Sequence, residues 1–103
     1  MADLTPEEAR LTAARALLQA AEDQLQAGDP KAALASARGG LERLGPDYAP
    51  AGVKDDTTMY LHLADEHERA GRLDRAARTA IDMLRTRVEL FTRSRADRSD
   101  ADA

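Results

Sequence analysis

The chain has 103 residues and a mass of 11.2 kDa, enough for one small domain, and only 3% of its residues are aromatic, so we expect a thin core of closely packed helices without a large ligand cavity. Its net charge of −4, from 15 basic and 19 acidic residues, argues against a general nucleic-acid binder, because such proteins carry a basic excess. Without cysteine there is no disulfide or thiolate chemistry, and without a long apolar run or a basic start we expect no signal peptide, no membrane span and a cytoplasmic location.

The first predicted helix covers residues 6–27. Thr5 is a favoured N-cap residue, Pro6 suits the first helical position, and Glu8 can complete a capping box. Gly28 then supplies the positive φ that commonly ends a helix. Apolar residues recur at spacings of three and four, which places one apolar stripe along this helix. The stripe consists of Leu11, Ala14, Leu18, Ala21 and Leu25.

A second helix follows after a very short turn. Asp29 and Pro30 repeat the pattern of a capping residue followed by proline, and the helix is expected to end near Gly45. Because so short a turn leaves no room for a crossover, the two helices should be antiparallel neighbours. The sequence therefore predicts a helical hairpin over residues 6–44.

A loop is predicted over residues 45–55, which contain two prolines and two glycines and have no helical periodicity. A third helix should begin after Asp55 or Asp56 and end at Gly71. Together with a fourth helix it should form a second hairpin over residues 56–95.

The fourth helix is expected to begin at about Asp74 and to end at Arg93 or Arg95. Residues 96–103 are polar and have no large apolar side chain, so they are predicted to be a disordered tail. The prediction is thus an all-α chain with a single domain over residues 1–95.

The two halves of the chain repeat one another. The segment LLQAAEDQLQAGDPKAALASARGGL at 17–41 corresponds to YLHLADEHERAGRLDRAARTAIDML at 60–84, with a constant offset of 43 residues between Gly28 and Gly71. Such a repeat indicates two copies of one helical hairpin. Small residues at fixed places would let the paired helices approach closely. These small residues are Ala21, Ala33 and Ala37 in the first copy and Ala64, Ala76 and Ala80 in the second.

This pattern resembles the tetratricopeptide repeat (TPR) family, whose unit is a helical hairpin of about 34 residues. The resemblance covers roughly residues 14–47 and 57–90. The chain departs from the family where Gln24 and His67 replace an expected aromatic residue and where extra residues separate the two units. The resemblance implies four helices in two antiparallel hairpins. The alternative is a closed four-helix bundle with the same helices.

The histidines and serines do not form a pattern typical of catalysis or metal binding. His62 shares a helix face with Asp65 or Glu66, but His62 and His67 are five residues apart and point in different directions. None of the three serines has a histidine nearby in the sequence. We therefore expect no enzyme activity, no metal and no cofactor.

The predicted fourth helix is rich in arginine, interrupted by Asp74, Asp82 and Glu89. We expect a solvated face whose arginines pair with acidic residues of the third helix or with neighbours on their own helix. The alternative is a patch for RNA or another anionic partner. The arginines are Arg72, Arg75, Arg78, Arg85, Arg87, Arg93 and Arg95.

The TPR resemblance implies a ligand groove lined by the first helix of each hairpin. A non-catalytic protein-protein interaction or scaffold module that binds a peptide or protein partner is therefore expected, with no nucleic acid and no membrane involved. Its acidic residues favour a ligand with some positive charge. The expected partner-binding residues are Arg15, Leu18, Glu22, Leu61, Asp65, Glu68 and Arg69, with Leu25, Gln26 and Thr58 beside them in the same groove.

The alternative function is structural. In that case the chain is a self-associating helical subunit that forms a homodimer through the fourth helix and has no peptide groove. Leu84, Val88 and Phe91, with Leu90 alongside, would supply the contact.

Overall fold

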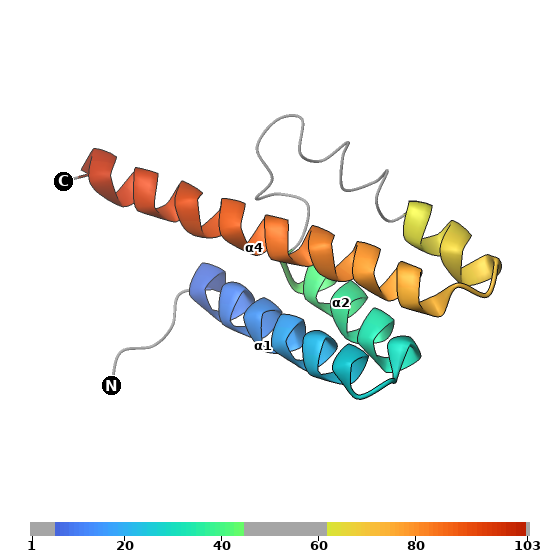
Figure 1. Ribbon diagram of the computed structural model, residues 1–103. Helices are drawn as coiled ribbons and strands as arrows, with labels where there is room; N and C mark the ends of the chain where they lie inside the picture. The colour runs from blue at the N-terminus through green and yellow to red at the C-terminus, as the bar shows by residue number, and fades with distance from the viewer. Residues whose placement is uncertain (1–5, 45–61, 103) are drawn as a thin grey trace.

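The computed structural model describes residues 6–44 and 62–102, and every regular element in these two ranges is helical (Figure 1). The all-α prediction is confirmed. The helices are α1 (Pro6–Gln26), α2 (Pro30–Leu44) and α4 (Leu73–Asp102), and a helical segment at 62–69 comes directly before α4. The predicted loop at 45–55 and the predicted start of the third helix lie outside the described residues.

The turn between α1 and α2 is a Schellman motif followed by an N-cap. Gly28 has a φ of 85°, its amide donates to the Leu25 carbonyl at 3.1 Å, and the Asp29 amide donates to the Gln24 carbonyl at 2.9 Å. The carboxylate of Asp29 then accepts a hydrogen bond from the Ala32 amide at 3.1 Å. The positive φ and the capping role predicted for these residues are confirmed.

The turn before α4 has the same backbone geometry. Gly71 has a φ of 79° and donates to the Glu68 carbonyl at 3.0 Å, while the Arg72 amide donates to the His67 carbonyl at 2.8 Å. Each hydrogen bond lies one repeat length after its counterpart in the first turn. The internal sequence repeat is therefore also a repeat of local structure.

The helices α1, α2 and α4 each contact the other two. In Figure 1, α1 and α4 run side by side in opposite directions, with α2 behind them. The fourth helix therefore lies beside α1, where the predicted pair of open hairpins would place the third helix. Among the described helices, α4 also packs against α2, so α1, α2 and α4 form one mutually packed group.

Small residues at the helix contacts are buried, as the repeat pattern predicted. Ala33, Ala37 and Ala76 have no exposed surface and Ala80 is 1% exposed. Because alanine adds only a methyl group beyond the backbone, these positions determine how closely the helices approach. Ala21 and Ala64 are buried in the same way.

The helices α2 and α4 approach closely at Gly40 of α2, which lies against Leu84 of α4. An ideal Cβ placed on Gly40 would be 2.5 Å from Leu84 Cδ2, closer than real Cβ atoms come to other heavy atoms. The neighbouring Gly39 has room, because its Cβ would be 3.6 Å from the nearest atom of Leu17. Of these two helical glycines, only Gly40 is therefore required by the packing.

Gln24 occupies the place of the aromatic residue that the TPR pattern expects. Its side-chain amide lies 2.7 Å from the hydroxyl of Ser36 on α2. A polar bridge between α1 and α2 thus replaces aromatic packing at this position.

The end of α4 differs from the prediction. The helix was expected to end at Arg93 or Arg95 and to be followed by a disordered tail at 96–103, but α4 continues to Asp102. No glycine or proline occurs after Arg93, and alanine and arginine are good helix formers. The lack of large apolar residues predicted disorder, but the absence of a stop signal favours continuation of the helix.

The far half of α4 also differs from the expected solvated arginine face. Arg87 is only 6% exposed, and burial lowers the pKa of its guanidinium. Leu84, Val88 and Phe91, the proposed dimer contact, are buried within a single copy of the chain. These side chains already belong to the core, so the alternative homodimer gains no support from them.

Candidate functional site

Two polar contacts join α1 to α4 along their length. Arg15 Nη2 donates to Thr92 Oγ1 at 2.9 Å, and Arg85 Nη2 donates to Glu22 Oε1 at 2.7 Å. The step from Arg15 to Glu22 along α1 equals the step back from Thr92 to Arg85 along α4. The two antiparallel helices therefore stay in the same register from one contact to the other.

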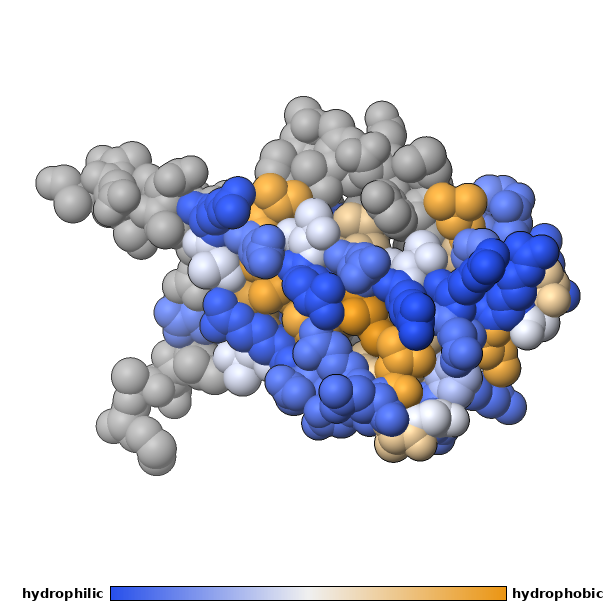
Figure 2. Space-filling model, viewed as in Figure 1, coloured by the Kyte–Doolittle hydropathy of each residue, from blue (hydrophilic) through white to orange (hydrophobic). Residues whose placement is uncertain are grey.

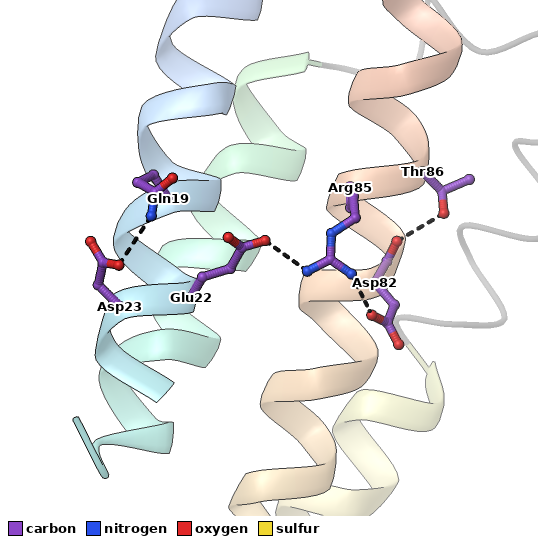
Figure 3. A network of polar contacts seen from close by, with 6 residues as sticks. All are labelled: Gln19, Glu22, Asp23, Asp82, Arg85 and Thr86. Carbon is purple, nitrogen blue, oxygen red and sulfur yellow. Dashed lines mark hydrogen bonds and ion pairs between the residues drawn. The ribbon is translucent and has the colours of Figure 1, made fainter. Parts of the chain in front are cut away.

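Arg85 lies between two carboxylates (Figure 3). In addition to Glu22, it donates to Asp82 Oδ1 at 3.2 Å, one turn earlier on α4. The hydrogen bond with Glu22 raises the pKa of the Arg85 guanidinium, and the charges of both carboxylates act in the same direction. Since Arg85 and Glu22 are both partly exposed, this bridge should stabilise the fold by less than about 1 kcal/mol. The pairing of Arg85 with a neighbour on its own helix was predicted and is confirmed.

Beside this bridge, α1 and α4 enclose an open groove of about 580 Å³. Leu25, which is half-buried, and the 3% of Ile81 that is exposed form the apolar part of its lining, and both walls carry polar side chains. Figure 2 shows a strip of apolar surface between two hydrophilic ridges on the face where α1 and α4 lie. The lining consists of Gln19, Glu22, Asp23, Leu25, Gln26, Arg78, Ile81, Asp82 and Arg85.

The structure separates the predicted partner-binding residues into two groups. Arg15 and Glu22 of α1 contact α4, and Leu18 is partly buried against the core. Leu25 and Gln26 line the groove, whereas Leu61 and Thr58 lie outside the described residues. Their contacts show that the first group is directed toward α4, not toward the third helix as expected.

The second group is directed toward α2. One guanidinium nitrogen of Arg38, Nη2, contacts Asp65 Oδ1 and also donates to Glu68 Oε1 at 3.1 Å. Arg69 is exposed. The acidic residues of the third helix were one of two predicted sets of partners for the arginines of the fourth helix; Asp65 and Glu68 instead pair with Arg38 of α2. These contacts therefore do not show a single groove lined by the first helix of each hairpin.

Arg38 should hold the segment at 62–69 against α2. We expect Arg38→Gln to speed amide hydrogen exchange at residues 66–69 by about two- to fivefold. The effect is small because each partly exposed ion pair stabilises a fold by at most about 1 kcal/mol. Glu66→Gln is a suitable control, since Glu66 pairs only locally with His62 at 3.1 Å. Equal exchange in both variants would show that Arg38 does not anchor this segment.

The histidines lie apart from the groove. His62 is exposed and pairs with Glu66 on the next turn, as their shared helix face predicted, and His67 is half-buried. Within residues 6–44 and 62–102, no group of three or more histidine or acidic side chains is arranged to hold a metal ion. The same ranges contain no helix with both the length and the apolar character needed to cross a bilayer.

The groove is the feature that sequence reasoning missed. The TPR pattern places the third helix beside α1 and therefore does not predict that acidic residues of α1 pair with arginines of α4. Leu25 was placed on the apolar stripe of the first helix, whereas Ile81 was not assigned to any predicted apolar face, so the sequence indicated only one side of the lining.

No known protein family, no curated protein and no solved structure matches this chain.

Proposed function

We propose that this chain is a non-catalytic protein-binding module of the cytoplasm, built from two TPR-like hairpins, and that its partner binds in the groove between α1 and α4. The matching turns at Gly28 and Gly71 support the repeat relationship, because the same hydrogen bonds occur at the same places in both copies. The lack of cysteine suits a reducing compartment.

The observation that carries this proposal is the groove itself. It combines apolar surface from Leu25 and Ile81 with charged walls, the combination that protein interfaces use for affinity and for orientation. The lining contains carboxylates, guanidinium groups and amides but no serine or histidine, so it supplies no nucleophile paired with a base. Binding is therefore the chemistry that the lining supports best.

A bulky residue in the groove should block the partner. We expect Gln26→Trp, at the exposed end of α1, to remove partner proteins from an affinity capture with the whole chain as bait, as measured by mass spectrometry. Ala35→Trp is the matched control, because Ala35 is exposed on α2 and is not part of the groove.

Each captured protein should then be purified and titrated directly against the three forms of the chain. Loss of binding by at least about tenfold with Gln26→Trp alone would support the groove. Undiminished binding by a folded Gln26→Trp variant would contradict it.

A further inference from the structure

We propose that the occupant of the groove is an amphipathic helix with basic residues beside its apolar stripe; this inference rests on the function proposed above. The groove residues of α1 span 19–26 and those of α4 span 78–85, so each wall is about two helical turns long. A helix laid along the groove could present an apolar residue to the half-buried Leu25, whereas Ile81 is only 3% exposed, so most contacts would be made with the polar side chains of the walls.

The α1 wall of the groove is acidic. It carries Glu22 and Asp23 beside two glutamines and contains no cation. The carboxylate of Asp23 is exposed and accepts a hydrogen bond from Gln19 at 3.0 Å. Because the amide of Gln19 is neutral, this bond does not neutralise the negative charge of Asp23. The carbonyl end of α1 lies at the same end of the groove and adds partial negative charge.

The α4 wall does not balance this charge. Arg85 is shared between Glu22 and Asp82, so its single positive charge faces two negative ones. Arg78 is the other cation of the lining; it lies about two turns from Arg85 and, because α1 and α4 are antiparallel, toward the carbonyl end of α1. The lining thus has three carboxylates and two guanidinium groups; Arg85 pairs with Glu22 and Asp82, whereas the carboxylate of Asp23 bonds to the neutral amide of Gln19. A basic partner side chain placed near Asp23 gains attraction, whereas an acidic one is repelled.

The test uses two designed amphipathic peptides of about 15 residues, with identical leucines and either lysine or glutamate at the polar positions. The backbone amide signals of Leu25 and Ile81 report groove binding by NMR, and titration gives the affinity. We expect the lysine peptide to shift both signals and to bind at least about tenfold more tightly than the glutamate peptide at low salt.

Charge variants of the protein provide the control. Asp23→Lys should lower the affinity for the lysine peptide by about tenfold and raise the affinity for the glutamate peptide, because it replaces a negative charge on the α1 wall by a positive one. Glu42→Lys makes the same charge change on the exposed surface of α2, away from the groove, and should alter either affinity by less than about twofold.

The outcomes separate this inference from the proposed function. If the glutamate peptide shifts Leu25 and Ile81 and binds as tightly as the lysine peptide, the partner class is wrong and the groove remains a binding site. If neither peptide shifts these signals, both proposals fail. If the signals shift with protein concentration alone, a second copy of the chain is the occupant and the inference is overturned.

Discussion

Gly40→Ala should destabilise the protein by up to about 2 kcal/mol, whereas Gly39→Ala should stabilise it by up to about 1 kcal/mol. Alanine in a helix interior is favoured over glycine by about 1 kcal/mol, and both substitutions have this gain. At Gly40, however, the added methyl group would lie 2.5 Å from Leu84 Cδ2, and Leu84 is fully buried, so its side chain has to shift within the core. Overpacking of this kind costs about 1–3 kcal/mol, which exceeds the gain.

Chemical denaturation of both variants tests this contrast between neighbouring glycines. Leu84→Ala alone should cost about 2–5 kcal/mol through the cavity it leaves, and Gly40→Ala should no longer be harmful in that background. A Gly40→Ala variant as stable as Gly39→Ala would show that α2 and α4 do not meet as closely as described.

Ala76→Leu should lower the free energy of unfolding by about 1–3 kcal/mol, because the larger side chain has no space at a position with no exposed surface. Ala35→Leu is the matched control: Ala35 is exposed on α2, and leucine is nearly as good a helix former as alanine. Thermal unfolding followed by circular dichroism compares the two variants. An unchanged midpoint for Ala76→Leu would contradict the packing of the α4 start.

Local structure followed closely from the sequence because its causes are local. Asp29 and Pro30 mark the start of α2, and Gly28 and Gly71 end helices through a backbone conformation that other residues disfavour. The burial of Ala33 and its equivalents also followed, since a repeat of small residues indicates close helix contacts.

The arrangement of the helices could not be predicted in the same way. The apolar stripe of α1 shows which face is buried but does not identify the helix that covers it. Glu22 faces Arg85, far away in the sequence, and nothing in the local pattern distinguishes this partner from a residue of the third helix. The groove depends on that pairing, so the sequence indicated some of its residues, including Glu22 and Leu25, but not the opposite wall.

The separation of the two groove walls along the chain determines when the groove can form. The α1–α2 hairpin closes through a turn of a few residues, so it can fold early and locally. The contact between Glu22 and Arg85 instead spans 63 residues and requires closure of a much longer loop. During synthesis, the groove residues of α1 emerge from the ribosome well before those of α4. We therefore expect the groove to be assembled last, so that a growing chain folds its first hairpin before it gains a complete binding surface.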